Sequence, residues 1–459
     1  MAIVSSGLAI DYPTLRRMVG SLQVKFAEEG IVAGSLVEIR LVDYLAWPVT
    51  LALFRIGAAS YIAHKTPASL LPDFVLGPKS VDLNQIAKHI EFDAAWLRNT
   101  DLTDPIEISG GREPAPQDLV RVILTSGTSG EAKGVGITFG DLHRRLEFLK
   151  SYWADRSVEL NLMGLAATGG FYSALGAFTK GRPYFSIHPL SSGFVARLAA
   201  SQIELLTASP IQLRDLLLEL KKQNASLKGV KLVRLAGASA PTALLEEISR
   251  ALPEAEIEVL YGSTEGGGVT KKIYRMGDSP NDVGLPIKGV TLEVVEESGR
   301  QCESGQLGLV RYKTPGLIAG YLNNKVATES HFKDGWFYPG DVGHIDELGH
   351  LVLAGRDGDH VNLGGEKINL SKFDQIADAF PGVEEAAAFL IPSEFGFEKL
   401  GLAIVGNSAD MKALDSQIRS RFGTVFPSVY FRTDSIPRNE NGKTDRASLR
   451  DIFLKSQRL

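Results

Sequence analysis

The stretch "LTSGTSGEAKG" at residues 124–134 decides how the rest of this chain is interpreted, because it concentrates hydroxyl groups, glycines and a lysine. The β-rich run at 120–124 enters it and an extended segment at 134–138 leaves it, which predicts a loop between two strands. Backbone N–H groups freed by glycine, together with hydroxyls and an ammonium group, can surround phosphate oxygens. The candidate phosphate-binding residues are Thr125, Ser126, Gly127, Thr128, Ser129, Gly130 and Lys133.

This loop is not a Walker A loop, which reads G-x-x-x-x-G-K-[ST] and leads from a strand into a helix. The residue five positions after Gly127 is Ala132, and the residue five positions after Gly130 is Val135. The next element also reads as a strand. The sequence therefore disfavours a P-loop kinase or ATPase, and for the loop taken alone a plain turn is the alternative.

Composition sets the outer limits. With 459 residues, of which 44% are hydrophobic, the chain can bury large cores and is expected to form more than one domain. The formal net charge is −5 and no long basic run occurs, so neither nucleic acid nor an anionic membrane surface is indicated as a partner. Cys302 is the only cysteine, which excludes an intrachain disulfide and suits a reducing compartment. The first residues lack the pattern of a signal peptide and no apolar run could span a membrane, so we expect a cytoplasmic protein.

The pattern along the first 356 residues predicts an α/β fold. Helical spacing of apolar residues over 15–26 is followed by a strand at 36–42, a buried helix at 45–58 and a strand at 60–65. After the hydroxyl-rich loop, Asp141 is expected to cap a helix. A strand at 257–260 runs into "YGSTEGGG", and from about residue 284 the pattern becomes strand and turn.

The last hundred residues form a different unit. Predicted helices at 371–380 and 410–422 alternate with predicted strands at 384–391, 400–406 and 428–433. We therefore predict a large, multi-subdomain α/β domain over 1–356 and a small, mobile α+β domain over 357–459.

Five further segments occur in order along the chain: "YGSTEGG" (261–267), "GQLGLVRYKTPGLIAGYLNN" (305–324), "GWFYPGDVGHID" (335–346), "GRDGDHVNLGGEKI" (355–368) and "PRNENGKTDR" (437–446). With the opening loop, they make the chain resemble the adenylate-forming superfamily. This superfamily includes acyl- and aryl-CoA synthetases, peptide-synthetase adenylation domains and beetle luciferases. The resemblance extends over essentially the whole chain.

The resemblance implies a role for each motif. The loop would hold the β- and γ-phosphates of ATP, Thr264 would contact a phosphate oxygen, and Glu265 would bind Mg²⁺, a hard cation that prefers oxygen. Tyr261 would stack on adenine, and Asp341 would accept hydrogen bonds from both ribose hydroxyls. The residues implied to bind adenine and ribose are Gly237, Ala238, Ser239, Tyr261, Gly262, Ser263, Asp341 and Arg356. Without the resemblance, we would interpret Tyr261 as a core residue, Glu265 as a solvated loop carboxylate and Asp341 as a turn residue.

The implied catalytic residues are Lys443, Thr264 and Glu265, and Lys443 supplies the cation. A carboxylate oxygen attacks the α-phosphorus of ATP, so two anions must meet while charge builds on the non-bridging oxygens. No general base is needed, because a carboxylic acid is already ionised at neutral pH. The resemblance also places a hinge two residues after Arg356, at Gly358, or at Asp357 or Asp359 if the register shifts by one. Glycine lowers the cost of a large backbone rotation, and the alternative is a glycine that only ends a strand in a turn.

The implied acyl pocket is lined by Thr168, Gly170, Phe171, Ser209, Gly262 and Gly267. No aspartate occurs between residues 162 and 181, where amino-acid adenylation domains carry one, so an α-amino acid is disfavoured. Ala166, Ala167 and Thr168 stand where many acyl- and aryl-CoA synthetases have an aromatic–histidine pair. Two interpretations stay open here: the small residues leave volume that Phe171 and Tyr172 could wall, or they serve close helix packing.

The function expected from the resemblance is ATP-dependent activation of a carboxylic acid, followed by transfer of the acyl group to a thiol. ATP, Mg²⁺ and coenzyme A are the expected cofactors, with CoA the expected acceptor. An alternative acceptor is the phosphopantetheine of a separate acyl or aryl carrier protein. An alternative of another class is a catalytically silent homologue that binds a nucleotide or an acyl-AMP.

Overall fold

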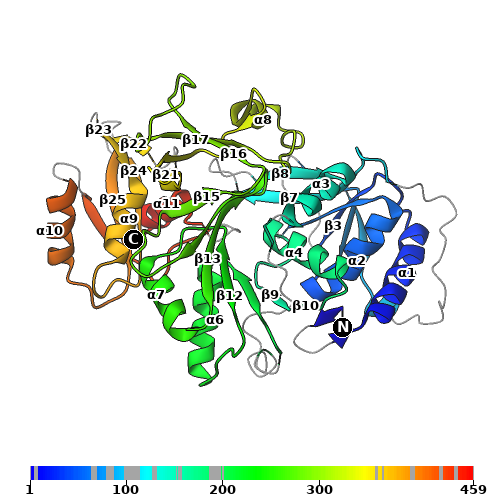
Figure 1. The fold of residues 1–459 in the computed structure, drawn as a ribbon. Helices are drawn as coiled ribbons and strands as arrows, with labels where there is room; N and C mark the ends of the chain where they lie inside the picture. The colour runs from blue at the N-terminus through cyan, green and yellow to red at the C-terminus, as the bar shows by residue number, and fades with distance from the viewer. Residues whose placement is uncertain are drawn as a thin grey trace.

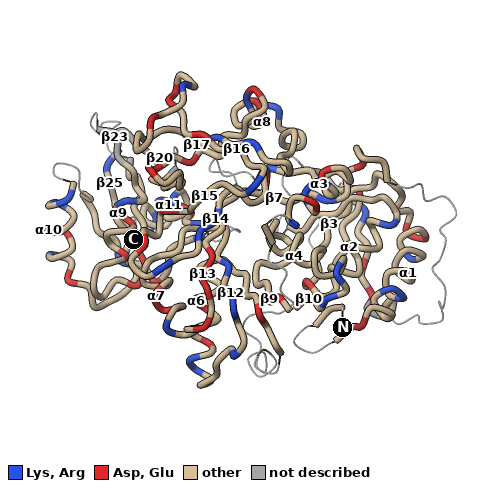
Figure 2. Tube along the Cα trace, in the orientation of Figure 1, with Lys and Arg blue, Asp and Glu red and all other residues tan. Residues whose placement is uncertain are grey.

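A computed structural model gives the fold shown in Figure 1. It describes the chain apart from residues 1, 5–8, 64–69, 79–86, 98–113, 127–131, 151, 154–157, 186–197, 199–200, 357–359, 364–365, 393–397, 423–426, 439–442 and 458–459. The N-terminal elements lie on one side of the molecule, and the C-terminal helices and strands lie on the other (Figure 1). Lys and Arg are intermixed with Asp and Glu along the described chain (Figure 2). No described helix combines the length and the apolar character that a membrane crossing requires.

The first sheet has the order β6-β5-β3-β4-β7-β8 among the described residues. Its strands are parallel except for the antiparallel pair β7–β8. Helices α1 (Tyr12–Glu28) and α2 (Asp43–Ile56) cover it, and Trp47 of α2 is completely buried. The strands are β3 (Leu36–Ile39), β4 (Ala59–Ile62), β5 (Phe74–Gly77), β6 (Lys88–Glu91), β7 (Leu119–Ser126) and β8 (Ala132–Thr138).

The second sheet is longer and mixed. Its order in the described chain is β18-β19-β17-β20-β21-β15-β14-β13-β12-β11-β9-β10-β1-β2, with β16 beside β17. The strands of its N-terminal side are β1 (Ile3–Val4), β2 (Ala9–Ile10), β9 (Glu159–Asn161), β10 (Tyr184–Phe185), β11 (Leu205–Ala208), β12 (Leu232–Ala236) and β13 (Glu256–Ser263). The remaining strands are β14 (Gly267–Tyr274), β15 (Asp282–Pro286), β16 (Thr291–Val295), β17 (Gly308–Lys313), β18 (Phe332–Lys333), β19 (Trp336–Phe337), β20 (Asp341–Ile345) and β21 (Leu351–Arg356). Its helices are α4 (Thr168–Thr179), α6 (Pro210–Lys222), α7 (Thr242–Ala251) and α8 (Lys325–His331).

The C-terminal unit has cores of its own. Two clusters of buried apolar side chains draw all their described members from residues 370–454, whereas the other clusters lie within 2–353. The boundary after residue 356 stays a prediction. The elements of the unit are β22 (His360–Leu363), β23 (Glu366–Asn369), α9 (Leu370–Asp378), β24 (Glu385–Pro392), β25 (Glu398–Val405), α10 (Met411–Phe422), β26 (Val429–Arg432) and α11 (Arg446–Ser456).

Most predicted elements are found, but the start of one helix differs and several elements were not predicted. Helix α3 (Phe139–Lys150) begins before Asp141, so the prediction that Asp141 caps it was wrong. Thr138 is the capping residue: its hydroxyl accepts from the Asp141 N–H at 3.1 Å, and the Asp141 carboxylate accepts from the Thr138 N–H at 3.0 Å. This reciprocal pair is a capping box with aspartate in place of glutamate. The sequence interpretation also missed several helices, among them α6, α7 and α11, the last of which follows Lys443.

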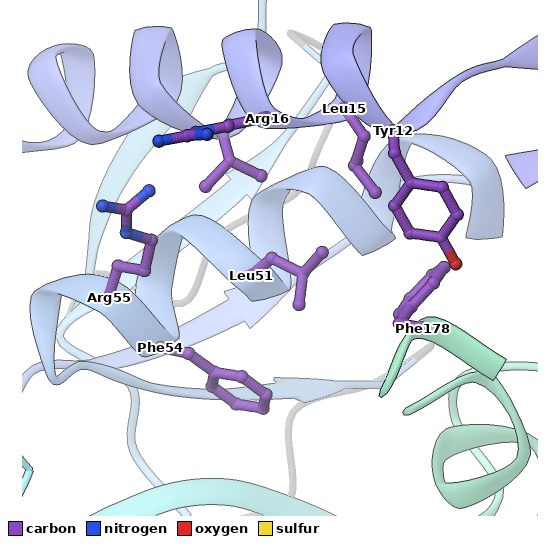
Figure 3. A pocket seen from close by; sticks show the side chains of 8 residues that line it. Tyr12, Leu15, Arg16, Leu51, Phe54, Arg55 and Phe178 are labelled. Carbon is purple, nitrogen blue, oxygen red and sulfur yellow. The ribbon is translucent and has the colours of Figure 1, made fainter. Parts of the chain in front are cut away.

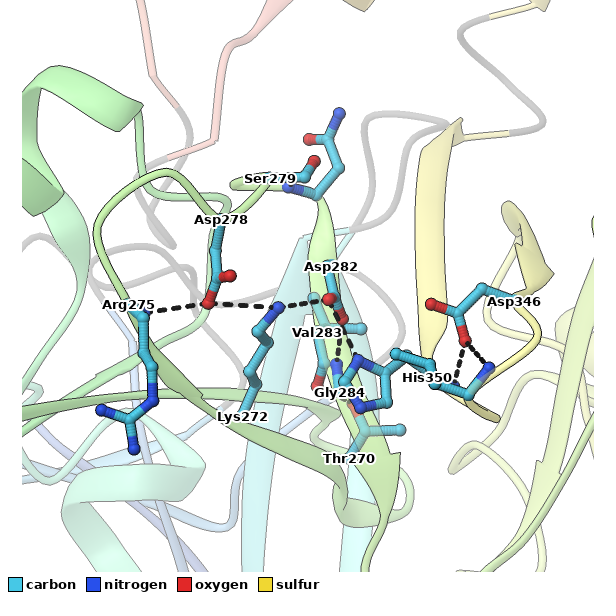
Figure 4. A network of polar contacts seen from close by, with 12 residues as sticks. Thr270, Lys272, Arg275, Asp278, Ser279, Asp282, Val283, Gly284, Asp346 and His350 are labelled. Atoms are coloured by element: carbon cyan, nitrogen blue, oxygen red, sulfur yellow. Dashed lines mark hydrogen bonds and ion pairs between the residues drawn. The ribbon is translucent and has the colours of Figure 1, made fainter.

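A polar network joins three strands near the end of the large unit (Figure 4). Asp282 of β15 forms an ion pair with Lys272 of β14 and lies 3.0 Å from Nδ1 of His350, which precedes β21. Burial alone would raise the pKa of Asp282, but the contacts with Lys272, His350 and the Gly284 N–H hold it below its usual value. The network joins β14 and β15 to the residue that precedes β21.

Candidate active site

The strands β9, β11, β12 and β13 run parallel as direct neighbours, so their carboxyl ends meet at one edge of the sheet. In open α/β sheets this edge is where ligands bind. Thr168, Ser209 and Gly237 follow three of these strands, and Tyr261 lies near the carboxyl end of the fourth. The fold therefore brings segments from distant parts of the sequence to one edge.

The turn between β13 and β14 is built for close backbone approach. The register of the pair shifts between Tyr261 and Gly262, which marks a bulge. A Cβ atom on Gly262 would lie 2.1 Å from the Gly267 carbonyl oxygen, so only glycine fits. The Ser263 hydroxyl accepts from the Tyr312 hydroxyl at 2.9 Å and from the Glu265 N–H at 3.1 Å. These contacts hold the turn in one shape.

Glu265 and Thr264 are held at this turn. The Glu265 side chain is 7% exposed, and its Oε1 accepts a hydrogen bond from the Tyr321 hydroxyl at 2.6 Å. The Thr264 hydroxyl accepts from the Thr168 hydroxyl at 3.0 Å, so the Thr264 proton can be donated elsewhere. Arg145 of α3 supports the turn from behind, donating to the Glu265 carbonyl at 2.5 Å and to the Gly316 carbonyl at 2.7 Å.

This donor set fits Mg²⁺. A carboxylate and a hydroxyl are hard oxygen donors, and Mg²⁺ usually takes one or two protein ligands plus phosphate and water. Within the described residues Oε1 of Glu265 is hydrogen-bonded and Oε2 is not, which leaves one carboxylate oxygen for a cation. No group of three or more metal-type side chains occurs in the described chain.

Tyr261, Asp341 and Arg356 are brought together from three strands. The Tyr261 hydroxyl donates to Oδ2 of Asp341 at 2.6 Å, and Asp341 is 7% exposed. Asp341 of β20 pairs directly with Arg356 of β21. The side chain of Arg356 lies outside the described residues.

Gly237, Ala238 and Ser239 are exposed in the segment that follows β12. Gly237 has φ of +89°, which favours glycine. Because Ala236 pairs with Leu260 in the neighbouring strand, this segment starts beside Tyr261. The structure thus places the implied adenine-binding residues along one edge.

The predicted loop between two strands is a hairpin. β7 and β8 are antiparallel, with Ser126 opposite Ala132 and Thr125 opposite Lys133. Gly127, Thr128, Ser129 and Gly130 lie outside the described residues, as do the side chain of Ser126 and the predicted hinge Gly358.

A buried arginine fixes the hairpin to the second sheet. Arg121 of β7 is fully buried and donates to the Ser60 hydroxyl and to the Leu165 carbonyl, both at 3.0 Å. Leu165 lies just before α4, and its N–H donates to Asp43 at 3.2 Å. Burial lowers the pKa of Arg121 to about 9, and Asp43 acts in the opposite direction. Arg121 therefore remains a cation at neutral pH.

The implied pocket residues divide into two groups. Phe171 is completely buried and stacks on Trp47 with 5.9 Å between ring centroids, so here it is a core residue. A Cβ on Gly170 would lie 1.8 Å from the Gly164 carbonyl oxygen, which favours the close-packing interpretation of this glycine. Ser209 caps α6 in a capping box with Gln212.

Thr168 and Gly267 belong to the other group. Thr168 is half-buried and contacts Thr264, as described above. Gly267 has φ of +77° and begins β14 opposite Ser263. These two residues border the turn that carries Glu265.

A separate surface cavity of about 330 Å³ lies between α1, α2 and the end of α4 (Figure 3). It is lined by Tyr12, Leu15, Arg16, Val19, Leu51, Phe54, Arg55 and Phe178. Every candidate site residue lies outside this lining, so the cavity is not part of the site.

Lys443 is half-buried at the base of a loop in the C-terminal unit. Arg438 and Thr444 form a bridge across the loop, and the Asp445 N–H donates to the Pro437 carbonyl at 2.8 Å. Arg446 forms an ion pair with Asp374 of α9 at 2.6 Å, and Arg438 forms one with Glu385 of β24. The loop that carries Lys443 is therefore anchored at both ends.

Three residues at the site were not singled out from the sequence. Tyr321 holds Glu265, Arg145 holds the backbone of the turn, and His331 of α8 lies 2.9 Å from the Lys133 ammonium. Tyr321 lies inside a quoted motif, but no signal in the sequence marked Arg145 or His331.

Comparisons with known proteins show the family to which this chain belongs. The family described as AMP-binding enzyme matches residues 77–322, more than half of the chain. The 4-chlorobenzoate–CoA ligase of an Arthrobacter species is 26% identical over 485 residues, covering 98% of this chain and 91% of the relative. The fatty acid–[acyl-carrier-protein] ligase ScoC of Streptomyces coeruleorubidus is 28% identical over 380 residues, covering 78% and 72%.

The fold is shared with a solved structure. The o-succinylbenzoate CoA synthetase MenE of Bacillus subtilis, in complex with AMP, superposes with a TM-score of 0.83 at 20% identity. The superposition covers 98% of this chain and 95% of that protein.

Proposed function

Because this chain belongs to the AMP-binding enzyme family, we propose that it activates a carboxylic acid with ATP and passes the acyl group to coenzyme A. In the first step a carboxylate oxygen bonds to the α-phosphorus of ATP and the bond to the leaving pyrophosphate breaks. In the second step the thiol releases its proton to solvent, its sulfur bonds to the acyl carbon of the adenylate, and the bond from that carbon to the AMP oxygen breaks. The enzyme is an AMP-forming acid–thiol ligase.

The observation that carries this proposal is the convergence of two residue pairs at one sheet edge. Tyr261 and Asp341 form an aromatic–carboxylate pair that suits a nucleoside, with the ring for the base and the carboxylate for the ribose hydroxyls. Thr264 and Glu265 follow Tyr261 within four residues and suit phosphate and its cation. A nucleoside and its phosphates would therefore lie side by side along the turn.

We assign each of the site residues a task in the first step. Asp341 fixes the ribose, Thr264 donates its free proton to a phosphate oxygen, and Lys133 meets the outer phosphates. Lys443 offsets the charge that builds on the α-phosphate as the carboxylate attacks. Mg²⁺, when bound at Glu265, would neutralise charge on the phosphate oxygens. A general base has no task, because the nucleophile is already ionised.

The acceptor is assigned to CoA on the names of the relatives. The Arthrobacter relative is a CoA ligase that covers nearly the whole chain, whereas ScoC acts on an acyl-carrier protein and matches less of it. A carrier-protein phosphopantetheine is therefore the second candidate acceptor. Thr264, Glu265, Asp341 and Lys443 are all present, which argues against a silent homologue. A reaction that consumes ATP and CoA supports a cytoplasmic location.

The acid is proposed to be one that lacks an α-ammonium group. The segment 162–181 offers no aspartate to pair with one. With Phe171 in the core, the specificity of the pocket is expected to depend on the exposed segment 237–239 and on Thr168.

The test is pyrophosphate release measured across aromatic, aliphatic and dicarboxylic acids. Each acid is assayed with CoA, with a phosphopantetheinylated carrier protein, and without an acceptor. Acid-dependent pyrophosphate release and a CoA thioester would support the proposal. Thioester formed on the carrier protein alone would favour the second acceptor, and the absence of acid-dependent release with every acid would refute the ligase assignment.

A further inference from the structure

Four side chains from four segments form a connected group beside the proposed phosphate site. They are Lys133 of β8, His331 of α8, Tyr321 of the segment before α8, and Glu265 of the turn after β13. Lys133 Nζ lies 2.9 Å from His331 Nε2, and its ammonium sits 5.1 Å from the centroid of the Tyr321 ring. The Tyr321 hydroxyl donates to Glu265 at 2.6 Å. The group thus links the phosphate-loop lysine to the proposed Mg²⁺ ligand.

The donor and acceptor roles within the group are fixed by chemistry. An ammonium group can only donate, so Nε2 of His331 must accept. The proton of the neutral ring is then on Nδ1, which lies 2.9 Å from the Tyr338 carbonyl oxygen and donates to it. The backbone carbonyl therefore selects the tautomer that can hold Lys133.

The ring of His331 is also fixed in orientation. Its centroid lies 5.9 Å from that of Tyr321, nearly perpendicular to it, and 6.2 Å from that of Phe337. Tyr321 is held in turn by a bridge to Val135 of β8 and by its N–H, which donates to the Thr328 hydroxyl at 3.0 Å. The packing leaves His331 little freedom to turn away from Lys133.

We infer that His331 is a positioning residue, which holds the Lys133 ammonium over the ring of Tyr321, the residue that contacts Glu265, so that the outer phosphates of ATP meet a preformed cation. The inference rests on the proposed function and deepens it. A free lysine side chain must lose rotamer freedom when it binds phosphate. A lysine already held by His331, over the Tyr321 ring, has lost that freedom before ATP arrives.

The inference predicts a selective loss of ATP affinity. AMP lacks the β- and γ-phosphates, so its affinity is expected to stay unchanged when the position of Lys133 is lost. His331→Phe keeps a ring of similar size but removes the acceptor, and should weaken Mg·ATP binding roughly 2- to 12-fold, the cost of ordering one long side chain. His331→Gln, whose amide oxygen can accept from Lys133, should retain affinity within about twofold of wild type.

The experiment is calorimetric binding of Mg·ATP and of AMP to the full chain, without any carboxylic acid. Lys133→Met and the double variant Lys133→Met/His331→Phe complete a cycle. If His331 acts through Lys133, then His331→Phe adds no further loss once Lys133 is gone. His143→Phe, on an exposed position of α3, is the matched control and should change neither affinity. If His331→Phe does not fold, His331→Ala replaces it in the same titrations. Unchanged AMP binding shows that each variant is folded.

Three results would overturn the inference. These are an unchanged ATP affinity in His331→Phe, an equal loss for ATP and AMP, and an additive loss in the double variant. The proposed function fails separately, if the wild-type chain binds neither nucleotide. If wild type and His331→Phe bind both nucleotides with the same ratio of ATP affinity to AMP affinity, the proposed function stands and only the role of His331 is refuted.

Discussion

The pair formed by Tyr261 and Asp341 gives the sharpest single prediction. Asp341 is 7% exposed and accepts a hydrogen bond from the Tyr261 hydroxyl at 2.6 Å. If its carboxylate also accepts from the ribose, then Asp341→Ala removes hydrogen bonds to a charged group. Each such bond contributes about 1.5–3 kcal/mol, so the loss of even one should lower AMP affinity roughly 10- to 150-fold.

The 2′-deoxy nucleotide turns this loss into a test of the ribose contact. Wild type should bind 2′-deoxy-AMP more weakly than AMP, because one hydroxyl can no longer donate to Asp341. In Asp341→Ala that difference should shrink towards zero, since the acceptor is already gone. The assay is calorimetric titration of both nucleotides into both proteins.

Tyr261→Phe is the companion variant, because it keeps the aromatic ring and removes only the hydroxyl that orients Asp341. A neutral hydrogen bond contributes about 0.5–1.5 kcal/mol, so a loss of roughly 2- to 12-fold is expected, smaller than that of Asp341→Ala. An Asp341→Ala protein that still discriminates against 2′-deoxy-AMP as wild type does would show that Asp341 does not bind the ribose.

Three further predictions follow from the site and its supports. Lys443→Ala should slow adenylate formation greatly while leaving thioester formation from supplied acyl-AMP nearly intact, because its cation acts on the phosphoryl step; equal losses in the two half-reactions would contradict this. Gly170→Ala should lower Tm by about 2 °C or more, because the new Cβ would lie 1.8 Å from the Gly164 carbonyl, whereas Gly176→Ala, on the same helix with open space, should not lower it. Asp282→Asn should destabilise the protein at neutral pH, and this effect should begin to shrink below about pH 4: the folded pKa of Asp282 is lowered, so its stabilisation is complete above the unfolded pKa and is lost as pH falls through the folded one. Denaturant unfolding at pH 7 and pH 3.5 measures it, and a destabilisation equal at both values would count against the ion-pair account.

The parts of the site that the sequence predicted are those whose chemistry is local. A hydroxyl-rich loop between two β-rich runs becomes the hairpin of β7 and β8, because each run pairs with its direct neighbour. "YGSTEGG" likewise becomes a strand end and a tight turn, with Gly262 where a Cβ would meet the Gly267 carbonyl. The sequence motifs predicted Asp341 and Arg356 as site residues, and the register of β20 and β21 places them opposite one another.

The parts that sequence could not predict depend on contacts between distant segments. The sequence allowed Phe171 to line a pocket, but in the structure its ring stacks on Trp47 of α2 in the core. Tyr321 and His331 carry no signature of their own. They reach Lys133 because the segment before α8 lies along β8, through the bridge between Val135 and Tyr321. Burial and register across such distances are set by tertiary packing, which no single motif encodes.

The central claim is that this chain forms an acyl-adenylate, and ATP–pyrophosphate exchange tests it most directly. Labelled pyrophosphate is incubated with the protein, ATP, Mg²⁺ and each acid of the panel, with no thiol present. The account predicts label entering ATP only when a suitable carboxylic acid is present, with the rate greatly reduced in Lys443→Ala. Exchange that does not depend on any acid, or cleavage of ATP to ADP and phosphate in its place, would contradict it.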